Sequence, residues 1–186
     1  MYKSIITPLA NNGRQRGITM IEFILYLILA LAVVIGGIVT YQSGLLSSRV
    51  NDVTRGLVSI SSETRGLHQN ASTYGSAVVL NAALINAGVI PSTFLGATAP
   101  SIRHPFNGDM TVTGQDQEFT ITLADVPTNA CIRITSVDTR GNGVAGIGIT
   151  GVSIEGTPIP DATLAAVSTA CENDGDPVEV EFTYAR

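Results

Sequence analysis

The sequence lacks tryptophan and is poor in aromatic residues of any kind. Tyrosine and phenylalanine contribute five residues each to a chain of 186. A hydrophobic core must therefore be built from valine, isoleucine, leucine and alanine, and roughly 100 residues or more are enough to form one. The length allows one domain of ordinary size plus an additional segment.

Charged residues are missing from a long stretch near the N-terminus. Between Ile18 and Arg49, Glu22 is the only charged side chain. Residues 20–39 form an apolar run which, at about 1.5 Å per residue of helix, spans a hydrocarbon core of about 30 Å. An acid inside such a run costs roughly 2.5 to 3.5 kcal/mol on insertion scales, so Glu22 is a functional candidate by default.

Acidic residues are absent before the apolar run and predominate after it. Lys3, Arg14 and Arg16 precede the run, so the positive-inside rule predicts a cytoplasmic N-terminus and an exported remainder. Removing residues 1–17 takes away three positive charges and changes the formal net charge from -5 to -8. An acidic exported domain with scattered arginines offers no surface for phosphate backbones, and we predict no nucleic-acid partner.

A conventional secretory signal is also missing. Such a signal has an apolar region of about 7 to 15 residues followed by small residues at the cleavage site. Here the apolar run is longer, no Ala-x-Ala follows it, and the small residue Gly17 precedes it. A plain transmembrane anchor would fit the run, but it would give no reason for Glu22.

The junction between the basic leader and the apolar run resembles the cleavage site of type IV prepilins, in the string GITMIEF of residues 17–23. The resemblance implies that a prepilin peptidase cuts after Gly17, so that Ile18 becomes the first mature residue. A leader of 17 residues and a first mature residue other than phenylalanine are more similar to the type IVb branch than to type IVa. Thr19 and Phe23 belong to the same motif and, with Glu22, are expected to act in assembly.

The resemblance also gives Glu22 a role. After cleavage Ile18 would carry a free α-ammonium, and Glu22 would lie one helical turn away, near the positive end of the helix dipole. In the family this carboxylate is thought to pair with the α-ammonium of a neighbouring subunit as it joins the filament, an interaction that favours a specific register. The alternative is an acid that merely lies near the lipid headgroups.

Hydrophobic periodicity predicts an α+β fold. Apolar residues between Tyr41 and His68 recur close to the 3.6 period, so we expect one helix of about 50 residues, apolar on all sides in its first half and amphipathic in its second. The Gly36-Gly37 pair inside it either allows close helix approach or allows the segment to extend, and the sequence leaves both open.

The remaining elements follow from alternation and turn residues. We expect a short helix over 76–88 that ends at Gly88, a turn over 103–112 that resembles one in type IVb pilins, and a helix over 161–172 capped by Asp161. Strands are expected over 117–123, 131–137, 146–154 and 178–184. The prediction is a long N-terminal helix packed on an antiparallel sheet, organised as a leader (1–17), a transmembrane or filament-core half-helix (18–41) and a periplasmic or extracellular globular domain (42–186).

Two cysteines, Cys131 and Cys171, are present. In an exported domain they are expected to be oxidised, and a bridge closing about 40 residues would stabilise the fold by about 4 kcal/mol in the chain-entropy model. They resemble the pilin pair that encloses the surface-exposed region near the C-terminus. We predict neither a metal site nor a cofactor.

Catalytic patterns are weak. Gly141-x-Gly143-x-x-Gly146 has the spacing of a dinucleotide fingerprint, but a strand-like stretch follows it where that mechanism needs a helix N-terminus, so a hairpin loop is expected. His68 and His104 lie in separate contexts without the spacing of a metal site or triad. The acids of residues 172–177 do not match an EF-hand. We therefore do not expect an enzyme.

These observations favour the major subunit of a type IVb pilus, a helical homopolymer. Its expected partners are further copies of itself, the prepilin peptidase, the assembly machinery and, before assembly, the inner membrane; afterwards it would lie in an extracellular pilus. Its role would be adhesion, aggregation or contact between mating cells. The last of these follows from the resemblance to the pilins of conjugative thin pili.

Two other classes stay open. The first is a minor pilin or a type II secretion pseudopilin, although a pseudopilin domain is usually smaller and often carries a Ca²⁺ loop, so the cysteine pair and the mature length of 169 residues favour the pilin. The second is a membrane-anchored enzyme or binding module, which would need a cleft constellation that the sequence does not offer.

Overall fold

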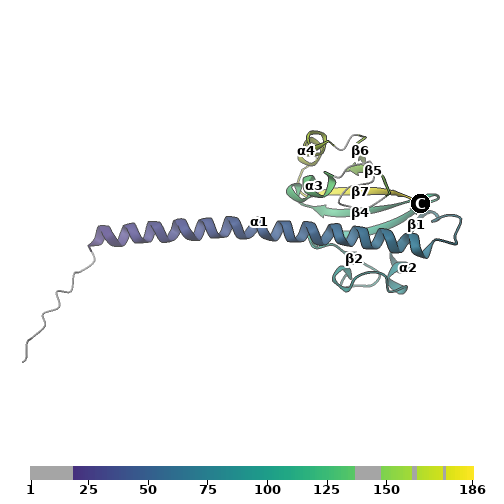
Figure 1. Ribbon diagram of the computed structural model, residues 1–186, viewed down its shortest axis with the longest axis horizontal. Helices are drawn as coiled ribbons and strands as arrows, with labels where there is room; N and C mark the ends of the chain where they lie inside the picture. The colour runs from purple at the N-terminus through teal and green to yellow at the C-terminus, as the bar shows by residue number, and fades with distance from the viewer. Residues whose placement is uncertain (1–18, 137–147, 161–162, 174) are drawn as a thin grey trace, which may run out of the picture. The chain divides into compact units, whose positions relative to one another are not determined.

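The computed structural model describes residues 19–136, 148–160, 163–173 and 175–186. The chain divides into two compact units, Met1–Ser43 and Gly44–Arg186. The boundary falls inside the first helix, α1 (Met20–Leu67), which has 48 residues as the periodicity predicted (Figure 1).

The second half of α1 is amphipathic. Val53, Leu57 and Ile60 are fully buried, whereas Arg49 and Arg55 on the other side are exposed. The buried side chains belong to the same hydrophobic core as the sheet of the globular unit. This half of α1 is therefore the central helix of the globular unit, and its apolar stripe is the reason it packs there.

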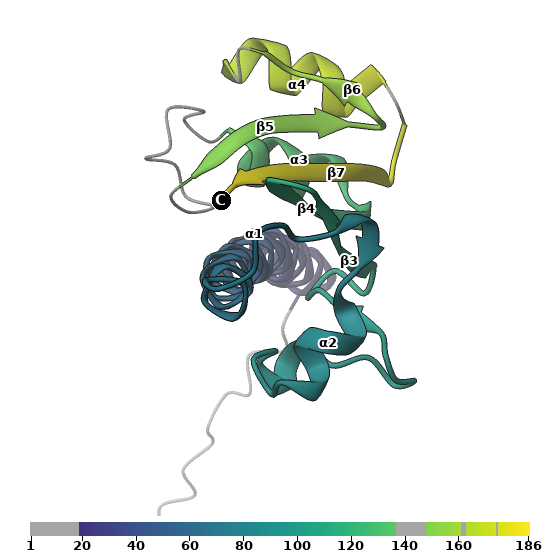
Figure 2. The same ribbon diagram turned by 90° about the vertical axis from the view of Figure 1, so that its right-hand side faces the viewer.

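The described strands form one antiparallel sheet with the order β1-β3-β4-β7-β5-β6, and β2 pairs with the same edge of β3 as β1. Figure 2 shows β4, β7 and β5 side by side in this order. The C-terminal strand thus lies in the middle of the sheet. The strands are β1 (Ser76–Val79), β2 (Ile102–Arg103), β3 (Asp109–Gln115), β4 (Glu118–Val126), β5 (Ile149–Ile154), β6 (Thr157–Pro158) and β7 (Val178–Ala185).

The two faces of the sheet differ in composition because the strands alternate. In register across β3, β4, β7 and β5, the row Val112, Ile121, Phe182 and Val152 is buried. Residues one position further along each strand point to the opposite face and are mostly polar and partly exposed. The helices cover the first face, so the domain has two layers and the predicted α+β fold class is confirmed.

One predicted strand is wrong. Residues 131–137 were expected to form a strand, but Thr128–Thr135 form a helix, α3. Ala130, Cys131, Ile134 and Thr135 are its buried residues, which is a helical spacing, whereas the alternation of Ile132 and Ile134 with Arg133 had suggested a strand. The carboxylate of Asp176 accepts a hydrogen bond from the Thr128 amide at 3.1 Å and so completes the start of this helix from a distant part of the chain.

A second prediction is only half right. The helix expected over 76–88 divides into the strand β1 and the short helix α2 (Asn81–Asn86), after which Gly88 adopts φ +71°. Val78 and Val79 pair with β3, because β-branched residues fit a strand. The expected turn at 103–112 is the hairpin that joins β2 to β3, and β3 itself was not predicted.

The later elements that are described agree with the prediction, apart from the short strand β6, which was not predicted. The strands β4, β5 and β7 lie where alternation placed them, and α4 (Leu164–Asn173) forms most of the expected helix. A single 3-10 turn spans Ser92–Phe94. The Asp161 cap and the glycines Gly141, Gly143 and Gly146 lie outside the described residues.

Candidate assembly site

The start of α1 is fixed by the backbone of Thr19. Its carbonyl oxygen accepts hydrogen bonds from the amides of Glu22 at 2.9 Å and Phe23 at 3.1 Å. Thr19 is therefore the N-cap and Met20 the first helical residue. Gly17 and Ile18, the predicted cleavage site, lie outside the described residues.

This placement gives Glu22 a position that the sequence reasoning did not use. With Thr19 as N-cap, Glu22 is the third residue of the helix, and Thr-x-x-Glu is the spacing of a capping box. A carboxylate in the first turn also lies close to the positive end of the helix dipole. The spacing could be read from the sequence once the N-cap was located, but the described residues form neither of the two side-chain hydrogen bonds of a capping box, so the helix dipole is the local effect on Glu22.

The first half of α1 exposes apolar side chains on every side. The helix is long and apolar enough to cross a membrane, and none of its most apolar window is buried within the chain. Exposing such a surface to water is unfavourable by about 25 cal/mol per Å² of apolar area, so this segment needs lipid or protein around it. The exposed large side chains are Met20, Ile21, Phe23, Ile24, Leu25, Tyr26, Leu27, Ile28, Leu29, Leu31, Val33, Val34, Ile35 and Ile38.

The Gly36-Gly37 pair lies within the continuous helix. The Thr40 hydroxyl donates to the carbonyl oxygens of Gly36 and Gly37, at 3.1 and 3.0 Å. A Cβ placed on either glycine would have no described atom within 4 Å beyond its own helix turn. The two glycines thus leave a shallow depression on the helix surface, and no described residue of the chain occupies it.

The disulfide joins the two helices that pack at one end of the sheet. Cys131 of α3 and Cys171 of α4 are bonded at 2.00 Å and are fully buried. The predicted bridge is therefore present, and the described part of the chain has no free cysteine. The Arg133 guanidinium, also on α3, donates to the Ser47 hydroxyl of α1 at 2.9 Å, which connects this region to the central helix.

His104 has a structural environment rather than a catalytic one. It is 2% exposed; its Nε2 hydrogen bonds to the Ala124 carbonyl at 2.6 Å, and its Nδ1 accepts from the Phe106 amide at 3.3 Å. Burial lowers the pKa of His104 below its usual value, against the opposing effect of the Ala124 hydrogen bond and the Asp125 and Asp109 carboxylates. The neutral ring therefore organises the hairpin between β2 and β3.

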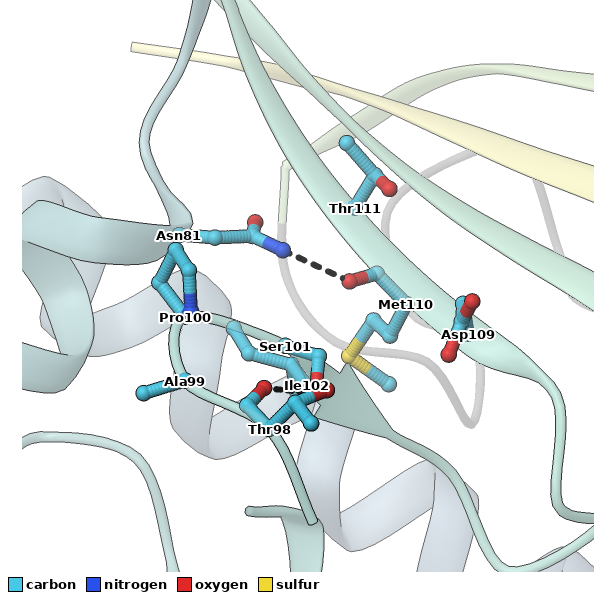
Figure 3. Close-up of a pocket in the computed structure, with 9 residues that line it drawn as sticks. All are labelled: Asn81, Thr98, Ala99, Pro100, Ser101, Ile102, Asp109, Met110 and Thr111. Atoms are coloured by element: carbon cyan, nitrogen blue, oxygen red, sulfur yellow. Dashed lines mark hydrogen bonds between the residues drawn. The ribbon is translucent and has the colours of Figure 1, made fainter. Parts of the chain in front are cut away.

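The pocket drawn in Figure 3 has one ionisable side chain in its lining, Asp109, which is paired with Arg103 at 3.3 Å. Its volume is about 300 Å³, and it lies between the edge of β3 and residues 98–102. The Asn81 side chain at its rim donates to the Met110 carbonyl at 2.9 Å and accepts from the Val112 amide at 2.8 Å, so it substitutes for a strand partner between β1 and β2. Within the described ranges no cluster of three or more His, Cys, Asp or Glu could hold a metal ion.

The family comparison covers almost the same residues as the globular unit, Gly44–Arg186. Residues 47–185 match the protein family described as PilS N terminal. The chain is 24% identical over 148 residues to the major structural subunit of the bundle-forming pilus of Escherichia coli O127:H6 (strain E2348/69 / EPEC), a match that covers 75% of this chain and 76% of that protein. The same subunit from Escherichia coli O111:H- is similar to the same extent.

Proposed function

This chain belongs to the PilS family of type IV pilins, and on that premise we propose that it is the major structural subunit of a type IVb pilus. The observation that carries the proposal is the fully exposed apolar half of α1 joined to a disulfide-bonded α+β domain of this family. Such a helix is buried by lipid before assembly and by other copies afterwards. The subunit has a structural role and no catalytic one.

The processing that we propose begins with a prepilin in the inner membrane. A prepilin peptidase removes residues 1–17 by cleavage after Gly17, and Ile18 becomes the new N-terminus. Residues 18–41 then form the half-helix that leaves the membrane for the filament core, and residues 42–186 form the outer domain. The three positive charges of the leader favour its retention on the cytoplasmic side, where cleavage takes place.

Glu22 has the central role in assembly under this proposal. Its carboxylate is within the first turn of α1, where the helix dipole favours negative charge, and it pairs with the α-ammonium of Ile18 on the neighbouring copy. Thr19 holds the first turn through its carbonyl oxygen, and Phe23 adds apolar surface next to the charged pair. An ion pair in apolar surroundings contributes register more than net stability.

The test is the identity of the filaments that cells release on shearing. We expect electron microscopy to show filaments whose dominant protein starts at Ile18 and has a mass reduced by the disulfide hydrogens. If the chain is a scarce component of filaments made of another protein, the minor-pilin alternative replaces this proposal. If it stays in the membrane fraction with residues 1–17 attached, the processing scheme is wrong.

A further inference from the structure

One large apolar side chain of the globular unit is more exposed than the others. Leu164, the first residue of α4, is 65% exposed, the highest value for a large apolar side chain among the described residues of Gly44–Arg186. Ala165 and Ala166, which follow it, are also exposed and carry no charge. The start of α4 is therefore an uncharged surface from which a leucine projects.

A pocket of about 380 Å³ lies elsewhere on the same unit, between the second half of α1 and residues 91–105. Phe94, Pro91 and Pro105 form its apolar wall. The Phe94 ring packs directly against Gly56 of α1, at a position where a Cβ would have no room. The size and the apolar lining are those of a site that takes a small apolar group.

The leucine and the pocket lie at opposite ends of the sheet. α4 lies next to β6, whereas Pro105 follows β2 at the other edge. Figure 2 shows α4 and α2 on opposite sides of β4 and β7. Leu164 cannot reach the pocket of its own chain, so only another copy could bring the two together. Such a contact joins two different surfaces, and when it does not close into a ring it produces an open helical array.

Charge also favours contact between these two surfaces. Without residues 1–17 the formal net charge is -8, which is -5 less three positive charges, so copies repel one another over most of their surface. Asp52, at the rim of the pocket, is exposed and forms no salt bridge within the described residues. A carboxylate is stabilised at the positive N-terminal end of a helix, and Leu164 marks that end of α4.

We infer that Leu164 of one copy inserts into the Phe94 pocket of the next copy, with Asp52 beside the start of the incoming α4. The inference rests on the proposed function, because a filament needs one contact between different surfaces that is repeated along its length. The first half of α1 is apolar on every side and so does little to fix the rotation of one copy relative to the next. A leucine in a pocket outside the core supplies that direction.

The direct test is cross-linking of sheared filaments that carry Leu164→Cys/Thr93→Cys. Thr93 is exposed and lines the pocket, and the two native cysteines are bonded to each other, so no native thiol competes. After oxidation with copper phenanthroline, we expect a ladder of dimers, trimers and larger species on a non-reducing denaturing gel. Each single-cysteine variant should stay monomeric. Efficient dimers of Leu164→Cys alone would show a contact between like surfaces and overturn the inference.

A second test removes the leucine without adding a thiol. Leu164→Ala keeps a good helix former, and Leu67→Ala is the matched control, a helical leucine that is 49% exposed and lies outside the pocket. We expect about tenfold fewer filaments from Leu164→Ala, because burial of a leucine side chain favours each contact by about this factor. Its thermal unfolding and the filaments of Leu67→Ala should be unchanged. Normal filament numbers for Leu164→Ala overturn the inference.

The rim charges give a further distinction. Asp52→Asn should reduce the number of filaments, because it removes the charge beside the start of α4, whereas Arg55→Gln on the same rim should not. The opposite result for these two variants contradicts the proposed orientation of α4.

Failure of the proposed function is scored separately. Wild-type filaments are counted by electron microscopy before any variant is compared. If wild-type cells release no filaments of this protein, the proposed function fails and the inference fails with it. If wild-type filaments are abundant and filaments of the double-cysteine variant give no ladder, only the inference is overturned.

Discussion

Glu22 lies in the first turn of α1, where the positive end of the helix dipole favours its carboxylate and where a cation from outside the chain could pair with it. Its own amide donates to the Thr19 carbonyl, which defines that turn. Under the proposed function the cation belongs to another copy, so the same side chain is compatible with a monomer in the membrane and contributes to assembly only when a second copy is present.

For Glu22→Val we expect normal cleavage and normal monomer stability but almost no filaments, because the variant removes the attraction to an incoming α-ammonium and leaves the fold intact. The N-terminal sequence of membrane-extracted subunit and a count of surface filaments measure both effects. Lys3 is the single lysine of the chain, so cleavage would leave the α-amine as the sole primary amine. An amine-reactive reagent should label free wild-type subunits and spare those in filaments.

Two outcomes would contradict the pairing. Abundant filaments of cleaved Glu22→Val would show that the carboxylate is dispensable for assembly. Accumulation of uncleaved Glu22→Val would instead make Glu22 a recognition residue for the peptidase.

His104 predicts how stability depends on pH. Its pKa in the folded state lies below the unfolded value of about 6.5, so the unfolded chain binds the proton more tightly. The contribution of His104 is complete above pH 6.5 and is lost as the pH falls towards the folded pKa. Protonation would also remove Nδ1 as the acceptor for the Phe106 amide.

We therefore expect the free energy of unfolding, measured by urea denaturation, to decrease as the pH is lowered from 7.5 to 5.5. The decrease should be at most about 1.4 kcal/mol per pH unit, the limit for a single titrating group. His104→Gln should be less stable at pH 7.5 and nearly independent of pH in this window. A wild-type curve as flat as that of the variant would show that His104 does not titrate differently on folding.

At the level of elements, the two helices joined by the disulfide are the part that depends most on a covalent constraint. Cys131→Ser should lower the free energy of unfolding by about 4 kcal/mol, a large share of the 5 to 15 kcal/mol typical of a domain. Steady-state subunit and filament numbers should fall together. The double variant Cys131→Ser/Cys171→Ser separates loss of the bridge from effects of a single free thiol; normal levels in both variants would contradict a stabilising role.

Substituting alanine at two glycines of α1 should change the stability of the domain in opposite directions. A Cβ on Gly56 would lie 2.2 Å from the Phe94 ring, whereas a Cβ on Gly66 would meet nothing within 4 Å. Gly56→Ala should destabilise the domain by about 1 to 3 kcal/mol through overpacking. Gly66→Ala should stabilise it by up to about 1 kcal/mol through helix propensity.

Thermal unfolding of the two variants tests this pair, and Gly56→Ala/Phe94→Leu should recover part of the loss. A Gly56→Ala variant as stable as Gly66→Ala would show that the Phe94 ring moves aside without cost.

The sequence predicted an element correctly wherever its apolar residues followed one clear period, either that of a helix or that of a strand. The apolar run and the stripe of Val53, Leu57 and Ile60 predicted α1 almost to its length, and strong alternation predicted β4 and β7. It failed over residues 131–135, where Ile132 and Ile134 alternate with Arg133 as in a strand, while Cys131, Ile134 and Thr135 have the spacing of a helix face. The helix is favoured by two contacts between distant segments, the disulfide to α4 and the hydrogen bond to Asp176 at the start of α3.

For the candidate site, too, some features could be predicted from the sequence and others could not. The roles expected for Gly17, Ile18 and Glu22 came from a short motif and its resemblance, and they need no tertiary structure. The neighbours across the sheet could not be predicted, because they depend on the register of four strands. Alternation indicates that Val112 and Phe182 point towards a core, but not that they lie in one row.

At the level of the whole molecule, the proposed route from membrane to filament depends on one cleavage. For Gly17→Val we expect uncleaved precursor to accumulate in the inner membrane, because a peptidase site that accepts glycine has no room for a branched side chain. Gly17→Ala should be cleaved more slowly but not blocked. Intact-mass measurement of the membrane fraction gives the answer, and mature chain starting at Ile18 in Gly17→Val cells would place the cut elsewhere.

The central position of β7 has a consequence for how the protein is made. The strands β4 and β5 are not bonded to each other but to β7, which follows all the other described strands in the chain and is synthesised after them. Until Val178–Ala185 have emerged, the two halves of the sheet have no common strand, and both present unpaired edges that invite aggregation. The sheet is therefore completed only after residues 178–185 have been synthesised, and a product that terminates before them lacks the strand that joins its two halves.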